Sequence, residues 1–379
     1  MQLRKGTAAL AASAVLAIAL TACNTSSTQA SGNTNTGGSA PRAAAKTGTT
    51  ADLVSISKLC GSKKVVVGMS DLFGGNSWRK ITRAEFEAEA KQCPNITRTL
   101  YTDAQNNPQK QISDINGLVA QGVNVLIVND LGPSSLPTLR KATAAGVKVV
   151  PFIANPGGKV GTDYTNYVAE DVVAYGAALA DWEVKALKGK GNVVVLGGLA
   201  GNSYSQAVYD AAKTALAKSG MTLLNTNGYI VTNWDPGQTQ KVVAGLLAKY
   251  SKIDGVISDY GGGSVGGIRA FLAANRPLPV WAANDSNQFA CLWNRYHPTQ
   301  PTFQIGTVSS RNWMARVALR EGVAAAEGIV DPEPTIIKLP LFEDSLAGGN
   351  LAPHCDPNLP PDAILSSQLS HAALTALFK

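Results

Sequence analysis

Residues 101–130 combine a loop, an amphipathic helix and a buried strand in one unit. The helical part carries apolar side chains three or four positions apart: Ile112, Ile115, Leu118 and Val119. Asn107 is suited to cap this helix, Pro108 to its first turn and Gly122 to the position just past its end. The β-branched run at 123–128 is typical of a parallel strand that is buried on both faces. A chain organised around such a unit is constrained to an α/β fold.

The same alternation of strand and helix continues along most of the chain. Further strands are expected at 64–69, 147–153, 192–196, 222–229, 255–258, 279–283 and 303–308. Helices are expected at 79–92, 134–145, 206–219, 239–249, 287–293 and 314–327. This alternation predicts doubly wound parallel sheets with right-handed crossovers. Roughly 320 residues follow the N-terminal region, which is too many for one small core, so we predict two lobes.

The N-terminal region has the features of a secreted lipoprotein. Residues 1–22 begin with Arg4 and Lys5 and continue in an apolar run that is too short to span a bilayer, which predicts a signal peptide. The tetrad Leu-Thr-Ala-Cys ending at Cys23 matches the bacterial lipobox, so we expect cleavage before Cys23 and a lipid on its sulfur. An ordinary signal peptide is the alternative. Residues 23–59, rich in small and polar side chains at their start, are predicted to form a flexible tether.

Composition and charge argue against several other classes of function. The net charge is +7, but the basic residues are scattered, so we expect no nucleic-acid partner. Three histidines and the absence of any CxxC spacing argue against a metal site. No GxSxG motif occurs and no histidine lies near an identifiable nucleophile, so we expect a protein that is not an enzyme. We also expect a monomer.

Four of the five cysteines lie beyond the lipobox, an even number that permits disulfides outside the cytoplasm. Cys60 precedes the first expected strand, and Cys93 ends the first expected helix just before the second strand. Both therefore belong at one edge of the same lobe. We favour the pairs Cys60 with Cys93 and Cys291 with Cys355 as a hypothesis.

Residues 105–129, QNNPQKQISDINGLVAQGVNVLIVN, closely resemble the second βα unit of the ribose-binding-like family of periplasmic sugar-binding proteins. The resemblance extends over roughly residues 63–340. It implies the type I periplasmic binding protein fold, in which two doubly wound parallel-sheet lobes are joined by a three-stranded hinge. Lobe 1 is expected to comprise 60–170 with 310–338, and lobe 2 to comprise 171–309 with part of 339–379.

The resemblance also implies a function. It predicts an extracytoplasmic lipoprotein, anchored to the outer face of the cytoplasmic membrane, that captures a small polar solute by hinge closure. The solute class is a sugar, a polyol or a nucleoside-like molecule, and the partners are the permease and ATPase subunits of an ABC importer. The alternative is a sensor lipoprotein that presents its ligand state to a membrane receptor kinase. Neighbouring permease and ATPase genes would favour transport over sensing.

Candidate solute contacts in lobe 1 follow two expected strands. The loop after the first strand carries Asn76, Ser77 and Trp78, where the family has an asparagine followed by aromatic residues that stack on the sugar. A helix cap for Asn76 and a core position for Trp78 are the alternatives. The strand at 147–153 leads to Asn155, in place of the Asp-Arg pair that many sugar binders of the family have there.

The remaining candidate contacts are Tyr204, Trp234, Tyr260 and Asp285 in lobe 2, and Ser310 where the chain returns to lobe 1. Asp285 stands where the family has its ligand-binding aspartate, with an N-cap for the helix at 287–293 as the alternative. Trp234 lies where the family places an aromatic residue against the ligand, and a packed loop tryptophan is its alternative. Ser310 replaces a glutamine of the family. Because the family's arginines are also missing, the resemblance does not name ribose, galactose or xylose.

Residues 259–266 read DYGGGSVG, which superficially matches the G-x-G-x-x-G fingerprint of dinucleotide sites, with Asp285 about 20 residues further on. A lone match of this kind is weak, and an exported protein lies away from the nicotinamide pool, so we expect no cofactor. The glycines are instead expected to expose backbone N–H groups at a helix N-terminus, able to accept an anionic or hydroxyl-rich ligand.

Overall fold

Two parallel sheets organise the computed structural model, which describes residues 45–129 and 133–379. The expected signal peptide, Cys23 and most of the expected tether lie outside the described residues. The two sheets form the two lobes expected from the sequence. No helix among the described residues has the length and apolar character needed to cross a membrane.

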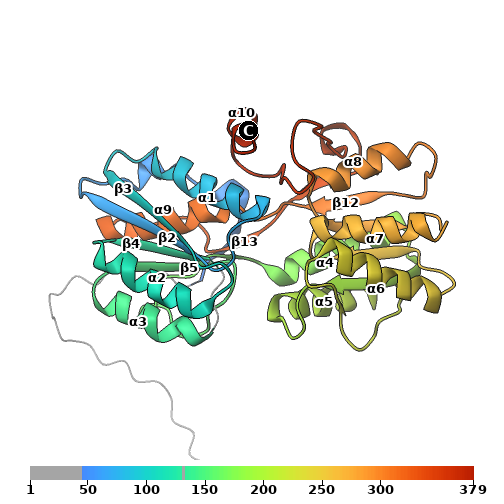
Figure 1. Ribbon diagram of the computed structural model, residues 1–379, viewed down its shortest axis with the longest axis horizontal. Coiled ribbons are helices and arrows are strands. Elements are labelled where there is room, and N and C mark those ends of the chain that lie inside the picture. The colour runs from blue at the N-terminus through green and yellow to red at the C-terminus, as the bar shows by residue number, and fades with distance from the viewer. Residues whose placement is uncertain (1–44, 130–132) are drawn as a thin grey trace, which may run out of the picture. The chain divides into compact units, whose positions relative to one another are not determined.

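The first lobe is built on a four-stranded sheet in the order β3-β2-β4-β5. All neighbouring strands in it are parallel. Its strands are β2 (Val65–Asp71), β3 (Ile96–Asp103), β4 (Val125–Asn129) and β5 (Lys148–Phe152). On one face lie α1 (Ser77–Ala90) and α9 (Met314–Glu327), and on the other α2 (Pro108–Ala120) and α3 (Leu136–Ala144) (Figure 1). A separate apolar core fills each of these two layers.

The second lobe has a longer sheet in the order β14-β12-β11-β10-β7-β8, with β9 beside β7. The strands are β7 (Lys190–Gly197), β8 (Gly220–Leu223), β9 (Ile230–Val231), β10 (Gly255–Ser258), β11 (Val280–Asn284), β12 (Ile305–Val308) and β14 (Leu341–Asp344). The pairing of β14 with β12 is antiparallel, and the other pairings are parallel.

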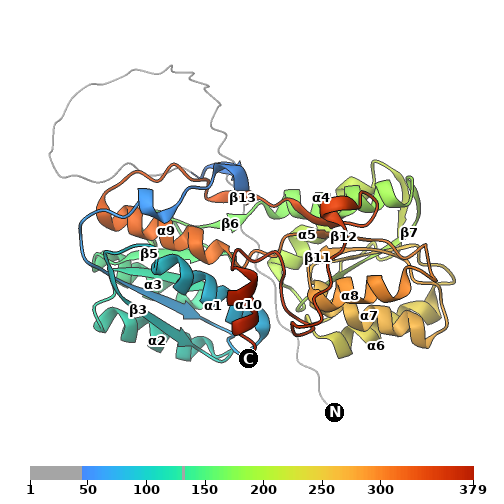
Figure 2. The same ribbon diagram turned by 90° about the horizontal axis from the view of Figure 1, so that it is seen from above.

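Helices cover both faces of this sheet (Figure 2). The helices α4 (Val172–Ala186) and α5 (Ser203–Leu216) lie on one face, and α6 (Pro236–Lys249), α7 (Gly261–Ala273) and α8 (Asn287–Tyr296) on the other. The expected strand at 222–229 is wrong in extent, because β8 ends at Leu223. Beyond Leu223 the side chain of Asn225, and not the backbone, bonds to β7. Its Oδ1 accepts from Val195 N, and its Nδ2 donates to the Val195 carbonyl, both at 2.9 Å.

A small parallel sheet, β1-β13-β6, lies at the hinge. Two of its strands are β6 (Ala169–Glu170) and β13 (Ile336–Lys338), where the chain passes between the lobes. The third strand is β1 (Thr47–Thr49), which comes from the expected tether. The chain also passes between the lobes after β12, and there Ser309 N–H donates to the Pro340 carbonyl at 3.2 Å.

The expected boundary of the tether at residue 59 is therefore too late. Residues 45–59 form β1 and two 3₁₀ turns, Thr50–Asp52 and Ile56–Lys58. Ile56 and Leu59 are buried, and Ile56 packs into the core between α9 and the first sheet. The start of the expected tether has few large apolar side chains, whereas Ile56 and Leu59 provide apolar surface that can be buried.

Both expected disulfides are confirmed: Cys60 bonds to Cys93 and Cys291 bonds to Cys355. The first joins the segment before β2 to the loop between α1 and β3, within one lobe. The second joins α8 to the chain beyond β14, and so attaches the C-terminal segment to the second lobe.

The glycines of 261–266 lie in the first turns of α7, which begins at Gly261, so they stand at a helix N-terminus as expected. The glycines serve close packing between helices. A Cβ atom on Gly266 would come within 1.7 Å of the Pro236 carbonyl oxygen on α6, and one on Gly267 within 2.4 Å of the Trp281 ring. Glycine at these positions lets α6 and β11 approach the α7 backbone directly.

Gly266→Ala is expected to destabilise the protein by about 1–3 kcal/mol, because the added methyl group meets backbone that cannot rotate away. Gly245→Ala on α6 is the matched control. A Cβ atom there meets nothing within 4 Å, so alanine should be neutral or stabilise by about 0.5–1 kcal/mol through its helix propensity. Urea unfolding followed by circular dichroism measures both. Equal stability of the two variants would contradict the close-packing argument.

Candidate functional site

The carboxyl ends of the parallel strands carry a set of buried polar side chains. Asp71 ends β2, Asn129 ends β4, Asn284 ends β11, and Asp259 directly follows β10. All four are at most 2% exposed. Ligands of open α/β sheets bind at such strand ends, because the polar groups of several strands meet there. These ends are therefore the candidate site.

The first-lobe part of the site centres on an ion pair. Arg79 Nη1 lies 3.1 Å from Asp71 Oδ1, and both side chains are buried. The Arg79 guanidinium also lies over two rings, 5.0 Å from the centre of Phe73 and 4.6 Å from that of Trp78. Planar cation–aromatic contacts of this kind fix the guanidinium in orientation as well as position.

Asn129 differs from the other strand-end residues. Its side chain is fully buried, and neither its Oδ1 nor its Nδ2 has a hydrogen-bond partner among the described residues. A buried polar group without a partner costs about 1–3 kcal/mol, so such groups are exceptional in native structures. Asn129 is therefore a ready donor and acceptor for a molecule that enters the strand ends.

The second-lobe part centres on Asp259. Ser205 Oγ donates to its Oδ2 at 2.5 Å, and Trp234 Nε1 donates to its Oδ1 at 3.0 Å. Burial raises the pKa of Asp259 to about 6, although both hydrogen bonds oppose this shift. The Trp234 ring lies against Gly198, where a Cβ atom would come within 2.0 Å of it. The indole is thus held in place by a hydrogen bond and by a glycine.

A second ion pair lies where the chain crosses between the lobes. Arg311, after β12, lies 3.1 Å from Glu170 Oε1 on β6, and both side chains are largely buried. The Arg311 guanidinium lies 4.5 Å from the centre of the Tyr204 ring, and the centres of the Tyr204 and Tyr175 rings are 6.2 Å apart. Burial raises the pKa of both tyrosines, so their hydroxyl groups stay protonated as donors.

Both carboxylate oxygens of Asp285 accept hydrogen bonds from other residues of the protein. Its Oδ1 accepts from Ser310 N at 2.8 Å and from Ser366 Oγ at 2.6 Å, and its Oδ2 accepts from Leu365 N and Ser366 N, both at 2.9 Å. A carboxylate has about four acceptor positions, and four donors fill them. The N-cap alternative is wrong, because the N-cap residue of α8 is Ser286.

The solute contacts expected in lobe 1 each have different neighbours in the structure. Asn76 caps α1, and its side chain accepts from Arg79 N at 2.9 Å. Ser77 Oγ donates to Asp362 at 2.7 Å. Trp78 is half-buried against an apolar cluster that the C-terminal segment shares with α1. Asn155 is exposed, and its side chain accepts from Gly157 N at 2.8 Å in a turn.

Two further expected contacts lie close to the strand ends of the second lobe. Tyr260 precedes α7, and burial together with the nearby Asp362 carboxylate raises its pKa to about 12. Ser310 is fully buried, and its Oγ accepts from Asn284 Nδ2 at 2.7 Å. The structure thus joins Ser310 with Asp285, but it assigns Trp78, Trp234 and Asp285 to three different sets of partners.

The site residues that sequence reasoning missed include Asp71, Arg79, Asn129, Asp259, Asn284 and Arg311. Asp259 had a usable signal, because it directly follows an expected strand. The expected first strand stopped at residue 69, which left Asp71 in a loop. Arg79 and Arg311 had no signal in the sequence, because each pairs with a carboxylate that comes near it only in the folded chain.

Two cavities lie away from these residues. One, of about 470 Å³, is lined mainly by β14 and the C-terminal segment, including Glu343, His354, Asp356 and His371. The other, of about 500 Å³, lies between the end of α7 and the loop at 299–302. Within the described ranges, no group of three or more His, Cys, Asp or Glu side chains could hold a metal ion.

Comparison with known proteins places this geometry in context. A family model described as periplasmic binding protein domain matches residues 67–326, well over half of the chain. The ribose import binding protein RbsB of Haemophilus influenzae is 25% identical over 184 residues, 48% of this chain and 61% of that protein. The xylitol-binding protein of Mycolicibacterium smegmatis is 26% identical over 185 residues, 48% of this chain and 51% of that protein. The chain thus matches only part of the length of these curated relatives.

A solved structure extends the similarity to most of the chain. The crystal structure of an ABC transporter solute binding protein from Thermobispora bispora has a TM-score of 0.60 and 25% identity. The match covers 74% of this chain and 85% of that one. These three proteins are named as binding proteins, in agreement with the expectation that the chain is not an enzyme.

The raised pKa of Asp259 predicts a pH dependence of stability. The folded state holds this proton more tightly than the unfolded chain, whose aspartate pKa is about 4, so the stabilising contribution is complete below pH 4 and is lost as the pH rises through about 6. The wild type should therefore lose about 2–3 kcal/mol relative to Asp259→Asn between pH 4 and pH 7.5. Urea unfolding at several pH values measures this difference. The exposed Asp210→Asn is the control, and a difference between wild type and Asp259→Asn that is constant with pH would contradict the assignment.

Proposed function

Because this chain belongs to the periplasmic binding protein family, we propose that it is an extracytoplasmic solute-binding lipoprotein that delivers a small polar solute to an ABC importer. The observation that carries the proposal is the concentration of buried polar groups at the carboxyl ends of strands in both lobes. A molecule rich in hydroxyl groups can bond to both sets at once. Neutral sugars, polyols and nucleosides are the solute class with this chemistry.

We propose four of the expected residues as solute contacts: Asn155, Tyr204, Trp234 and Tyr260. The three aromatic residues supply flat apolar faces with polar edges, which suit a ring or a chain of C–H groups flanked by hydroxyls. To these we add Asn129, whose amide has no hydrogen-bond partner among the described residues. Asp71 and Asp259 supply carboxylate oxygens beside them. Asp285, Ser310, Ser77 and Trp78 are not included, because the C-terminal segment engages them.

The proposed mechanism is hinge closure. A solute that bonds to both lobes stabilises the arrangement in which the lobes are close, and a permease then recognises that arrangement. The Glu170–Arg311 ion pair joins the first and second crossings, so it keeps the hinge segments in register while the lobes move. The relatives named above support solute capture in general, and the nature of this chain's own solute is part of the proposal.

The solute class is tested by thermal unfolding with D-ribose, xylitol, uridine and putrescine, one at a time. A cognate solute at 100 times its dissociation constant should add about 2.7 kcal/mol of stability. We expect stabilisation by at least one hydroxyl-rich compound and none by putrescine. Small-angle scattering with that compound should then show compaction. Stabilisation by putrescine alone would contradict the proposed class.

Trp234→Ala should weaken binding of the solute found in this way by at least about 10-fold, since it removes a stacking face and a partner of Asp259. Trp293→Ala is the matched control. The Trp293 ring stacks on the His297 ring, with 4.7 Å between the ring centres, away from the strand ends. Removal of the Trp293 ring should therefore leave the dissociation constant unchanged. Isothermal titration calorimetry measures both, and equal losses in the two variants would count against the site.

Membrane anchoring through Cys23 is a separate part of the proposal. Cys23→Ser removes the sulfur that would carry the lipid, so the protein should move from the detergent phase to the aqueous phase in Triton X-114 partition. Mass spectrometry of the wild-type N-terminal peptide should show a diacylglycerol adduct on residue 23. An unmodified N-terminal peptide from membranes would favour the ordinary signal peptide.

A further inference from the structure

The C-terminal segment lies outside the part of the chain that matches the family model, which ends at residue 326. It leaves the second lobe after β14 and ends in α10 (His371–Ala376), which lies beside α1 of the first lobe (Figure 2). Residues 355–378 of this segment are called the C-terminal strap below. Its contacts with both lobes indicate what it does.

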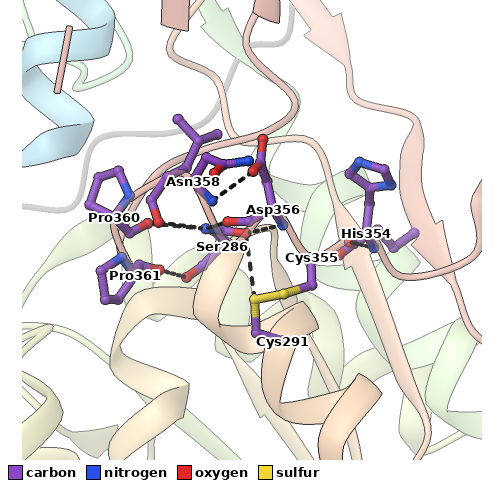
Figure 3. The surroundings of a disulfide bond; sticks show 11 residues. Ser286, Cys291, His354, Cys355, Asp356, Asn358, Pro360 and Pro361 are labelled. Carbon is purple, nitrogen blue, oxygen red and sulfur yellow. Dashed lines mark hydrogen bonds between the residues drawn. A yellow bond between two sulfur atoms is a disulfide. The ribbon is translucent and has the colours of Figure 1, made fainter. Parts of the chain in front are cut away.

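One end of the strap is fixed to the second lobe. The Cys291–Cys355 disulfide joins it to α8, and Asp356 N donates to Asn287 Oδ1 at 2.8 Å (Figure 3). In return Asn287 Nδ2 donates to the Asp356 carbonyl at 2.8 Å, and Gln288 N donates to the Pro361 carbonyl at 2.8 Å. A covalent bond and reciprocal hydrogen bonds thus hold the strap on the first turn of α8.

Asp285 extends this attachment to the end of β11. Three of the four donors to its carboxylate come from the strap: Leu365 N, Ser366 N and Ser366 Oγ. Ser366 Oγ also accepts from Ser310 N at 2.8 Å. Asp285 is 1% exposed, so the strap is the environment that makes its burial tolerable.

The strap is also fixed to the first lobe. Asp362 accepts from Ser77 Oγ on α1 at 2.7 Å, and Gln368 N donates to Glu85 Oε1 at 2.6 Å. Glu85 is itself buried against Arg316 of α9. These bonds place the strap on the two helices that cover one face of the first sheet.

An apolar cluster completes this attachment. Ile81 of α1 is fully buried against four strap residues: Leu359, Ala363, Ile364 and Leu374. All four are at most 6% exposed, and Trp78 packs against the same cluster. Burial of several aliphatic side chains makes this a packed interface and not a loose tail.

We propose that the C-terminal strap is a fixed fourth connection between the lobes, and that Asp285 anchors it. The strap holds α1 of the first lobe to α8 and β11 of the second, so it limits how far the lobes separate when no solute is bound. It also removes the Asp285 carboxylate from the solute site and leaves solute binding to the strand ends that it does not cover. This inference does not depend on the solute or on the proposed function.

Asp285→Asn tests the anchor in the full-length protein without solute. The substitution turns one acceptor oxygen into an N–H donor that faces the donors of the strap. Hydrogen–deuterium exchange should become at least about 10-fold faster at Leu365 and Ser366, and also at Gln368 on the first-lobe side. Small-angle scattering should show a larger radius of gyration, because the lobes are released to separate further.

Asp235→Asn is the matched control, because asparagine caps α6 as well as the native aspartate does, away from the strap. Ser366→Ala keeps the backbone donors and should give a smaller increase in exchange, so it tests the proposal even where Asp285→Asn folds poorly. Unchanged exchange in Ser366→Ala and Asp285→Asn would overturn the anchor. Faster exchange at 365–366 with unchanged scattering and an unchanged rate at Gln368 would overturn the connection between lobes.

Discussion

A parallel sheet is stable only when both of its faces are covered, and this requirement determines how the chain runs. The first sheet takes one of its covering helices, α9, from sequence that follows the second lobe, so the chain has to cross back. Buried arginines then fix α9 in place. Arg316 and Arg320 bond to Glu89 of α1 at 2.8 and 2.9 Å, and Arg320 also bonds to Glu333 at 2.8 Å, just before β13. The hinge is thus a consequence of how the first sheet is covered.

The same architecture creates the polar site. Strands that run parallel end at one edge, and the side chains that end them are buried there together, so each charge needs a partner. Asp71 forms an ion pair with Arg79, and Glu170 forms one with Arg311. Asp259 instead accepts hydrogen bonds from neutral donors, and burial raises the pKa of Asp259. These pairs hold their groups in fixed positions before any solute arrives.

Asp285 illustrates how little a position in a fold says about the role of a side chain. Its place at the end of a parallel strand is the place of a ligand contact in the family that the chain resembles. A buried carboxylate accepts whatever donors are within reach, and here the strap supplies three of them from the chain itself. The Cys291–Cys355 disulfide keeps these donors close, so the effective concentration of the strap is high.

The sequence by itself determined the elements, the two-lobe fold and the disulfide pairs. The strand expected at 255–258 and the helix expected at 314–327 have the bounds of β10 and α9, and Asn107 caps α2, because periodicity and capping are local. Only the tertiary structure decided that β1 completes the hinge sheet, that Gly266 serves helix packing and that Asp285 binds the strap. The partners of Asp285 lie as far as 81 residues away. Local pattern fixes which groups a strand presents at its end, but the partner of each group is set by which distant segment folds back against it.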